Sequence, residues 1–230
     1  ETKICDVRDF DRVHQVISEI KPDIILIAHA LKQVDICEMF PEESVKTNIL
    51  GTLNIVKSLK QLIDYNVFSP EKICFISTDK SCNPINVYGM CKSISEKIMI
   101  NFSEYLKNSD LYSKVLIVRY GNVLSSKGSI IPLLIKQANS NSDFTLTHVD
   151  MTRFMMTLKE AVLLIDNSIN IGNNGELWVP RLPSMKIIDL INIFCKKFNK
   201  SYKIIGLRPG EKIHEIMMSL EEGMKSSNLD

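Results

Sequence analysis

Short apolar runs rich in β-branched residues alternate with longer amphipathic segments through the first half of the chain. The apolar runs predict buried strands at residues 23–28, 72–77 and 114–120. The amphipathic segments predict helices at residues 42–65, directly after Pro41, and at residues 86–107. Strands that alternate with helices long enough to cross one face of a sheet are typical of β-α-β units. The pattern therefore predicts an α/β fold with a Rossmann-like, doubly wound parallel sheet.

The elements become shorter after Gly128. The pattern predicts helices at residues 130–138, 158–167 and 185–198, extended segments at 144–147, 176–179 and 202–205, and loops at 139–143 and 170–174. We interpret residues 1–128 as a dinucleotide-binding domain and residues 129–220 as a smaller C-terminal substrate-binding lobe, partly interleaved with it. Residues 221–230 are expected to form a disordered tail.

Composition and charge narrow the classes of partner. The 230 residues include 28 Lys plus Arg and 27 Asp plus Glu, for a net charge of +1, so no broad field attracts nucleic acid or an anionic membrane. The six cysteines form no Cys-x-x-Cys pair and no zinc-ligand spacing, which predicts no metal site and indicates a reducing compartment. No apolar run reaches bilayer length, and the first residues lack the features of a signal peptide. We therefore expect a cytoplasmic globular protein.

Small and polar residues follow each of the three predicted strands. They are Ala28, His29 and Ala30 after the first strand, Ser77, Thr78, Asp79 and Lys80 after the second, and Gly121 and Asn122 after the third. The carboxyl ends of parallel strands meet at one crevice, where ligands of such sheets bind. One shared site is therefore the simplest interpretation, and the ordinary polarity of loops is the alternative.

Tyr88 and Lys92 lie four residues apart near the start of a predicted helix. Residues at this spacing stack on one helix face, so the Lys92 ammonium can lie beside the Tyr88 phenol. A neighbouring positive charge favours the phenolate and is expected to lower the pKa of Tyr88, which would make it a proton acceptor. An exposed helix face without chemistry is the alternative for this short motif.

Residues 77–92 read Ser-Thr-Asp-Lys-Ser-Cys-Asn-Pro-Ile-Asn-Val-Tyr-Gly-Met-Cys-Lys. This run closely resembles the active-site segment of bacterial UDP-N-acetylglucosamine 4,6-dehydratases, above all the inverting enzymes of pseudaminic acid biosynthesis, within the extended short-chain dehydrogenase/reductase family. Further segments resemble motifs of that family in the same order: residues 30–34, 46–52, 118–123, 151–154, 179–186 and 208–212. The resemblance therefore covers nearly the whole chain.

The resemblance implies dehydration of a UDP-N-acetylhexosamine, UDP-GlcNAc, to a 4-keto-6-deoxy sugar nucleotide with inversion at C5. It implies a nicotinamide cofactor, NADP or NAD, and favours NADP slightly. The residues placed in catalysis are Thr78, Asp79, Lys80, Tyr88 and Lys92. Tyr88 would take the C4 hydroxyl proton, and Thr78 would orient that hydroxyl. Asp79 and Lys80 would serve as acid and base in the elimination; a surface ion pair is the alternative.

The resemblance also suggests binding residues. For the cofactor they are Asp6, Val7, Ala28, His29, Ala30, Asn48, Tyr88, Lys92 and Tyr120, and for the substrate Lys32, Asn122, Arg153, Val179, Arg208 and Glu211. Asp6 is equally well explained as a helix cap. Relatives usually read His-Ala-Ala-Ala where this chain has Ile27-Ala-His-Ala, so His29 is either a variant wall residue or a core histidine. Asn48 is expected to be structural, and the arginines have solvated surface roles as their alternative.

The chain contains no Gly-x-x-Gly-x-x-Gly, the phosphate-binding turn that opens domains of this type. It begins where the family would already have completed about two β-α units, on the order of 50 residues, so we expect a truncated chain. The family resemblance further implies a homo-oligomer. A UDP-hexose 4-epimerase, and a truncated inactive relative with a regulatory or assembly role, remain the alternative functions.

Overall fold

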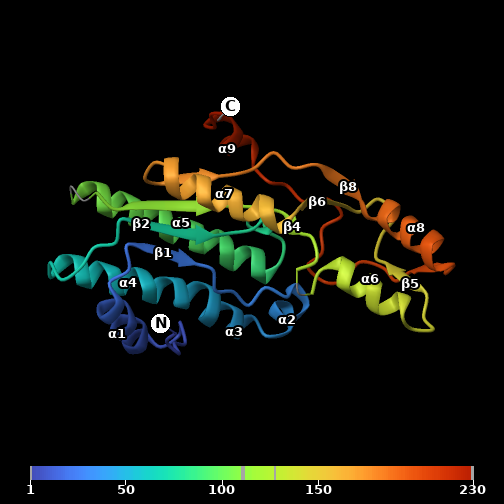
Figure 1. Ribbon diagram of the computed structural model, residues 1–230, viewed down its shortest axis with the longest axis horizontal. Coiled ribbons are helices and arrows are strands. Elements are labelled where there is room, and N and C mark those ends of the chain that lie inside the picture. The colour runs from blue at the N-terminus through green and yellow to red at the C-terminus, as the bar shows by residue number, and fades with distance from the viewer. Residues whose placement is uncertain (1, 110–111, 127, 229–230) are drawn as a thin grey trace.

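The structure, a computed structural model, describes residues 2–109, 112–126 and 128–228 (Figure 1). Its main sheet is parallel throughout, with the order β1-β2-β3-β7. The strands are β1 (Ile24–Ile27), β2 (Lys72–Ile76), β3 (Lys114–Val118) and β7 (Glu176–Trp178). The three strands predicted in the first half are confirmed, each one or two residues shorter than predicted. The predicted fold class, a Rossmann-like α/β fold with a parallel sheet, is also confirmed.

Helices cover both faces of this sheet, because successive strand residues point to opposite faces. Ile73 and Phe75 of β2 pack in a core with α1 (Phe10–Ile20), α4 (Gly51–Asp64) and α5 (Val87–Asn108). Cys74 and Ile76 face the other way, toward α7 (Leu158–Ile171). Figure 1 shows α7 above the sheet and α4 below it. The near-continuous apolar sequence of β2 and β3 follows from this double burial.

The helix predicted at residues 42–65 is interrupted. After α2 (Val34–Met39), the chain forms α3 (Pro41–Ser44), a π-helical segment η1 (Val45–Leu50) and then α4. A π segment loosens the regular backbone bonding, and here side chains compensate. The Asn48 carbonyl accepts hydrogen bonds from the hydroxyls of Thr52 at 2.8 Å and Ser95 at 2.9 Å. Hydrophobic periodicity does not reveal such an interruption, because the apolar face continues through it.

The second half adds two small sheets. Strands β4 (Asn122–Val123), β6 (Thr152–Met156) and β8 (Ser184–Lys186) form one, and β5 (Phe144–Leu146) and β9 (Tyr202–Ile204) form the other. They pack with α6 (Ile130–Ala138) and α8 (Ile187–Phe198), to the right of the main sheet in Figure 1, around a second core. Residues 158–178 return to the main sheet as α7 and β7.

Two helix boundaries predicted in this half are wrong by two or more residues. Met185 and Lys186 belong to β8 instead of the following helix, because they pair with β6 in antiparallel register. Helix α7 continues to Ile171, so the loop predicted at 170–174 begins two residues later. Its N-terminus is fixed by a capping box between Thr157 and Glu160. The divisions at residues 128 and 220 stay predictions.

The segment predicted as a disordered tail carries a short helix, α9 (Leu220–Met224). Ser219 and Glu222 form its capping box, and Glu222 also reaches inward to Arg119. Leu229 and Asp230, the last residues of the predicted tail, lie outside the described residues. None of the helices in the described ranges combines the length and apolarity that spanning a bilayer requires.

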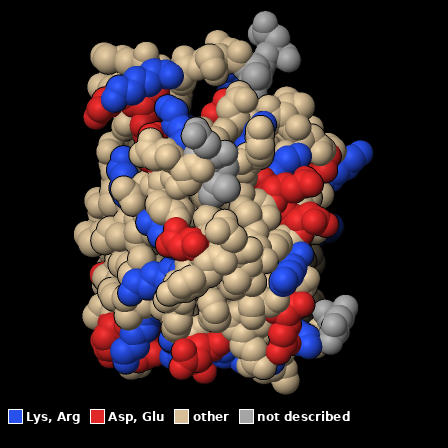
Figure 2. Space-filling model, turned by 90° about the vertical axis from the view of Figure 1, so that its left-hand side faces the viewer, with Lys and Arg blue, Asp and Glu red and all other residues tan. Residues whose placement is uncertain are grey.

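Figure 2 shows the face at the amino ends of the main strands, where positive and negative side chains are interspersed. This mixture agrees with the net charge of +1. On this side of the molecule, charge therefore gives no surface of a single sign that would attract a polyanion.

Candidate active site

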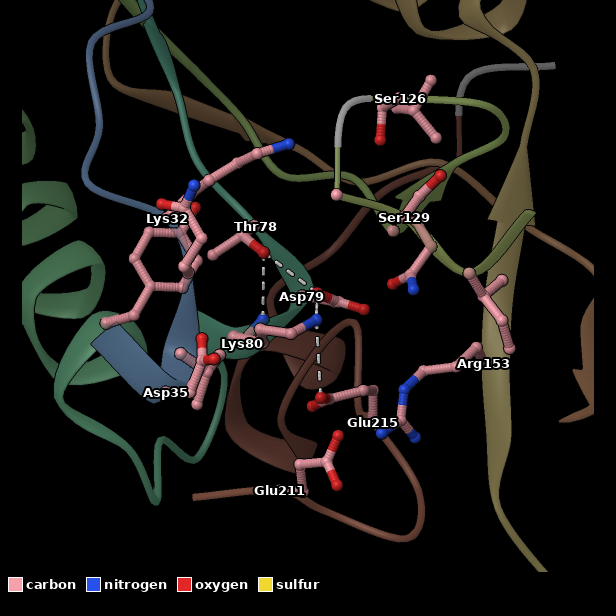
Figure 3. Close-up of a pocket in the computed structure, with 18 of the residues that line it drawn as sticks. Lys32, Asp35, Thr78, Asp79, Lys80, Ser126, Ser129, Arg153, Glu211 and Glu215 are labelled. Carbon is pink, nitrogen blue, oxygen red and sulfur yellow. Dashed lines mark hydrogen bonds and ion pairs between the residues drawn. The ribbon is translucent and has the colours of Figure 1, made fainter. Parts of the chain in front are cut away.

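A cavity of about 590 Å³ opens at the carboxyl ends of the main strands, between the sheet and the second half of the chain (Figure 3). Among the residues predicted for the site, its lining includes Ala28, Ala30, Lys32, Thr78, Asp79, Lys80, Tyr88, Lys92, Tyr120, Asn122, Arg153, Arg208 and Glu211. The structure thus brings all five residues predicted for catalysis to one cavity. Its volume is in the range of small-molecule sites.

Thr78, Asp79 and Lys80 are held where β2 leaves the sheet. The Asp79 amide donates to the Tyr120 carbonyl at 3.0 Å, so the pairing with the β3 strand continues one step beyond the regular sheet. The chain then turns through a short 3₁₀ helix, η2 (Asp79–Ser81), whose N-cap is Thr78. Ser81 closes the turn by donating from its hydroxyl to the Thr78 carbonyl at 2.6 Å. These bonds fix the backbone from which the three side chains project.

Asp79 and Lys80 form an ion pair inside the cavity wall. Lys80 Nζ lies 3.0 Å from Asp79 Oδ1, and the Thr78 hydroxyl donates to the same oxygen at 2.9 Å. The Asp79 side chain is 1% exposed and that of Lys80 is 19% exposed, so the pair is not a solvated surface contact. Within the described chain, Asp79 Oδ2 is buried without a hydrogen-bond partner. A buried acceptor of this kind can serve a ligand group.

A second carboxylate, Glu215, lies on the opposite side of the Lys80 amine. Its Oε1 is 3.5 Å from Lys80 Nζ, and its side chain is 2% exposed. Figure 3 shows the amine between the two acids, with Glu211 on the same C-terminal segment as Glu215. The sequence analysis did not single out Glu215. Its only sequence signal is its place three residues after Lys212, and no periodicity marks it as buried.

Tyr88 and Lys92 project from the first turns of α5, which packs directly onto η2. The side chain of Asn86 caps the helix by accepting from the Gly89 amide at 2.7 Å, and its own amide donates to the Gly210 carbonyl at 2.8 Å. A Cβ atom at Gly89 would lie 2.2 Å from the Lys80 carbonyl oxygen. Only a residue without a side chain allows this close approach between α5 and η2.

The expected lowering of the Tyr88 pKa is wrong for this structure. Burial raises the pKa of Tyr88 above its usual value of 10, and Tyr120 and Asp79 add to the effect, whereas a hydrogen bond with Thr78 opposes it. The Lys92 amine donates to the Ile76 carbonyl at 2.7 Å and lies 4.3 Å from the centre of the Phe75 ring. Burial lowers the pKa of Lys92 to about 8, against a smaller opposing effect of Glu96. Desolvation thus disfavours the charged form of both groups.

His29 and Asn48 lie outside the cavity lining. Burial, followed by the nearby charge of Lys92, lowers the pKa of His29 to about 4, while a backbone hydrogen bond with Thr47 acts in the opposite direction. The Asn48 side chain binds both backbone groups of Leu31, since it accepts from the Leu31 amide at 2.8 Å and donates to the Leu31 carbonyl at 3.0 Å. Both residues thus hold the loop that carries Ala28 and Ala30.

Asp6, Val7 and Val179 are likewise not part of the cavity lining. Asp6 pairs with Arg8 at 2.7 Å, and this hydrogen bonding lowers the pKa of Asp6 to about 2. Val7 packs against the main core, directly over Gly51. In this structure the three residues therefore make no contribution to the described cavity, and their proposed binding roles rest on the family resemblance.

The residues predicted to bind the substrate differ in how many of their hydrogen-bond donors are already used within the protein. The Arg153 guanidinium donates to the carbonyls of Thr152, Lys212 and Ile213 at 2.7–3.0 Å, so it braces the C-terminal segment. Arg208 pairs with Glu211 on the same segment but remains 58% exposed at its side chain. A guanidinium with exposed donors can still bind two phosphate oxygens. Lys32 and Asn122 line the cavity mouth and wall.

A buried ion-pair network lies behind the turn at Thr78, Asp79 and Lys80. Glu96 of α5 accepts from the hydroxyls of Ser77 and Ser81 and from the Arg119 guanidinium, whose Nη2 lies 2.7 Å away. Arg119 also binds Glu222 of α9 at 3.0 Å. Burial alone would lower the pKa of Arg119, but hydrogen bonds with the two acids raise it instead. The network ties the residues on either side of Thr78, Asp79 and Lys80 to α5 and α9.

The cavity fits the nicotinamide end of a dinucleotide by the chemistry of its donors. An ammonium has three N–H donors. In the hydrogen bonds of the described residues, Lys92 uses one of them, toward Ile76, so two remain for ribose hydroxyls. The Tyr88 phenol lies one helical turn before Lys92. Ala28 and Ala30 line the same cavity, and their side chains are small enough for the backbone there to approach a flat ring.

The parallel sheet, the buried Tyr-x-x-x-Lys pair and the polar turn after β2 together define a short-chain dehydrogenase/reductase type of α/β protein. Within that class the chain belongs to the polysaccharide biosynthesis protein family, whose model matches residues 1–230. It is 42% identical to a Methanocaldococcus jannaschii protein described as an uncharacterized membrane protein, over 95% of this chain and 66% of that protein.

Two further curated relatives carry enzyme names. A UDP-N-acetylglucosamine 4,6-dehydratase (inverting) from Campylobacter jejuni is 36% identical, over 95% of this chain and 62% of the enzyme. A UDP-glucose 4-epimerase from Rickettsia bellii is also 36% identical, over 98% of this chain and 64% of the enzyme. The chain therefore spans just under two thirds of these relatives, and its relatives are sugar-nucleotide enzymes of both kinds.

Solved structures agree on the fold. Pen from Bacillus thuringiensis superposes with a TM-score of 0.90 at 32% identity, covering 100% of this chain and 71% of that one. DesIV, a dTDP-glucose 4,6-dehydratase from Streptomyces venezuelae solved with NAD and TYD, superposes with a TM-score of 0.76 at 18% identity, covering 96% and 70%. The second likeness concerns the fold alone.

Proposed function

We propose that the protein removes water from UDP-GlcNAc, a UDP-N-acetylhexosamine, and forms a 4-keto-6-deoxy sugar nucleotide with inversion at C5. One observation carries the proposal: Asp79 and Lys80 form an acid and base pair in the same cavity as Tyr88 and Lys92. The C. jejuni relative with the matching name supports it. Residues up to 128 would hold the cofactor, and residues 129–220 would hold the sugar.

The first step is oxidation at C4 of the hexose. A nicotinamide cofactor, when bound, supplies the chemistry of accepting the C4 hydride and returning it to C6. Tyr88 takes the proton of the C4 hydroxyl, which Thr78 orients. For this the pKa of Tyr88 must fall when ligands bind. The positive charges of Lys92 and of an oxidised nicotinamide ring have the sign that lowers it.

The second step eliminates water across C5 and C6. The new C4 ketone makes the C5 proton acidic, and the C6 hydroxyl leaves with one added proton. Asp79 and Lys80 share one proton in their ion pair. When that proton is on Asp79, the carboxyl group is an acid for the leaving hydroxyl and the Lys80 amine is a base for the C5 proton. The unpartnered Oδ2 of Asp79 faces no competing donor among the described residues.

Inversion follows if the protonated Lys80 does not return its proton to the face from which it came. With a hydride that a bound cofactor would return to C6, C5 would regain a proton from solvent on the opposite face. The protons taken up by Tyr88 and Lys80 would replace those given up by Asp79 and by solvent, so the net change is the loss of one water. NADP is the cofactor that the family resemblance favours slightly, with NAD as the other choice; DesIV, which shares the fold, was solved with NAD.

Binding of the UDP group would fall to the C-terminal segment. Arg208 has exposed donors for the diphosphate, and Glu211 can accept from ribose hydroxyls. Lys32 and Asn122 would contact the sugar or phosphates from the cavity mouth, with Val179 and Arg153 supporting that side. On the cofactor side, Asp6 and Val7 would reach the adenine half, and the loop carrying Ala28, His29 and Ala30 would lie against the nicotinamide half, while Asn48 keeps that loop in place.

A UDP-hexose 4-epimerase is the second candidate, because R. bellii relatives of that name are as similar as the dehydratase. Epimerisation at C4 needs the hydride transfer and Tyr88 but no acid and base for C5 and C6. The buried Asp79–Lys80 pair has no task in that reaction, which favours dehydration.

The deciding experiment incubates purified protein, expressed from its complete gene, with UDP-GlcNAc and either NADP or NAD in D₂O. We expect a product lighter than its substrate by one water, carrying deuterium at C5. Asp79→Asn and Lys80→Ala should each suppress water loss far more than UDP-sugar binding. A product of unchanged mass would support the epimerase, and equal losses of activity and affinity in both variants would refute the assigned roles.

A further inference from the structure

Glu215 is a buried acid that the proposed reaction does not use. It belongs to the segment that follows β9, and its side chain is 2% exposed. A carboxylate this deeply buried is costly unless it is paired. Its Oε1 lies 3.5 Å from Lys80 Nζ and its Oε2 lies 3.5 Å from Lys212 Nζ. The acid therefore pairs with the proposed base from the side opposite Asp79.

Four charges of alternating sign form a line across the cavity wall: Asp79, Lys80, Glu215 and Lys212. The Lys212 amine is anchored in turn, because it donates to the Cys82 carbonyl at 2.8 Å. The line thus begins and ends next to η2, and the Lys80 amine is held from two sides within it. Without Glu215, Lys80 could rotate about its long side chain and keep only Asp79 as a partner.

The hydrogen bonding within this line is incomplete. Asp79 Oδ2 and Glu215 Oε2 are both buried and, in the described part of the chain, accept no hydrogen bond. A network built only for stability would leave no such acceptor, since each one costs free energy. Unsatisfied groups of this kind are expected where a ligand completes the bonding.

We propose that Glu215 is a positioning residue that holds the Lys80 amine toward the hexose ring. The inference rests on the proposed dehydration. Because Lys80 is the base for the C5 proton, the placement of its amine decides how well the elimination proceeds. An error of about 1 Å in such a placement can reduce a rate roughly 100-fold.

The same segment carries the proposed UDP-binding residues, Arg208 and Glu211. It is fixed to α5 through the bond from Asn86 to the Gly210 carbonyl and to η2 through Lys212. The proposed nucleotide-binding residues and the residue that positions Lys80 therefore lie on one short segment with a fixed position. Glu215 is the residue of this segment that contacts Lys80.

The test compares Glu215→Gln and Glu215→Asp with the wild type and with Glu221→Gln. The last variant is the matched control, because Glu221 is an exposed acid of α9 that pairs with Lys225. For Glu215→Gln we expect elimination, followed in single turnovers, to slow by about 10- to 100-fold while UDP-sugar affinity changes little. Glu215→Asp, which keeps the charge at a shorter reach, should recover part of the rate, and Glu221→Gln should match the wild type.

A second readout does not depend on turnover. Purified protein is treated with acetic anhydride, and acylation of Lys80 is followed by peptide mass spectrometry. Glu215→Gln should acylate several-fold faster at Lys80, because the amine is no longer held by the ion pair with Glu215 and can turn toward the reagent. Glu221→Gln should acylate at the wild-type rate. Near-ultraviolet circular dichroism of each variant confirms that the fold is retained.

Wild-type rates of elimination and acylation in Glu215→Gln would overturn the inference, as would a loss of UDP-sugar affinity that matches the loss of rate. Failure of the proposed function looks different. In that case the wild type itself loses no water from the sugar, while the acylation rates still report whether Glu215 holds Lys80.

Discussion

The contact between α5 and η2 gives the sharpest test of how the site is assembled. Gly89 lies inside α5, where alanine is normally the better residue by about 1 kcal/mol. Helix propensity alone therefore predicts that Gly89→Ala stabilises the protein. The structure predicts the reverse, because the new Cβ would lie 2.2 Å from the Lys80 carbonyl oxygen and 3.0 Å from its carbonyl carbon.

The magnitude follows from the distance. A carbon and an oxygen in ordinary contact are more than 3 Å apart, so α5 or η2 must move by roughly 1 Å, and both are backbone. Overpacking of this kind costs about 1–3 kcal/mol, which outweighs the gain in propensity. The same shift displaces Tyr88 relative to Lys80, and we expect a loss of roughly 100-fold in the rate of water elimination.

Urea unfolding and single-turnover elimination measure the two effects. Gly223→Ala is the matched control, because Gly223 is also helical and its Cβ would have no neighbour closer than 3.9 Å. That variant should keep full activity and be no less stable than the wild type. The reasoning fails if Gly89→Ala is more stable than the wild type and equally active, since the close approach would then carry no cost.

Three other outcomes test separate parts of the site. Tyr88→Phe should slow the first oxidation, measured as the rate at which reduced nicotinamide absorbance appears, by at least ~100-fold while UDP-sugar binding is retained. A normal absorbance change would contradict the role of Tyr88 as proton acceptor. The pKa of His29 is lowered from 6.5 to about 4, so the folded state should lose stability as the pH falls from 6.5 to 4, by up to ~3 kcal/mol. His29→Gln should not show this loss of stability between pH 6.5 and 4 in acid unfolding. Identical curves of stability against pH for the wild type and the variant would contradict the role of His29. Burial would raise the pKa of Glu222, but hydrogen bonds from Arg119 and Ser219 lower it to about 2. Glu222→Gln should therefore reduce the free energy of unfolding at neutral pH by roughly 1 kcal/mol in urea unfolding. An unchanged unfolding midpoint would refute a stabilising contact between Glu222 and Arg119.

The main strands and most helices could be predicted from the sequence because the residues that they bury are apolar and recur with the period of a strand or a helix. β2 and β3 are buried on both faces, and their sequences are almost entirely apolar. The polar residues after those strands were predicted to converge for a geometric reason, since parallel strands end together, and thirteen of the predicted binding and catalytic residues do line one cavity.

What could not be predicted depends on contacts between distant parts of the chain. Glu215 is 136 positions beyond Asp79, and nothing local marks it as buried. Arg119 falls near the end of the strand predicted at residues 114–120, and nothing in the sequence shows that its partners are Glu96 and Glu222. The direction of the Tyr88 pKa was wrong for a related reason: the spacing to Lys92 is visible in the sequence, but the depth of burial is a property of the whole fold.

The position of Arg119 bears on how the protein forms as it is made. Its guanidinium is shared between Glu96 and Glu222, so one support of the turn bearing Asp79 and Lys80 comes from a residue that follows Arg119 by 103 positions. During synthesis the sheet and α5 emerge from the ribosome first, with the Arg119–Glu96 pair available but without the acceptors that Glu222 provides for the Arg119 guanidinium. The turn bearing Asp79 and Lys80 would therefore gain this support only after residue 222 has been released, well after the strands on either side of it have been made.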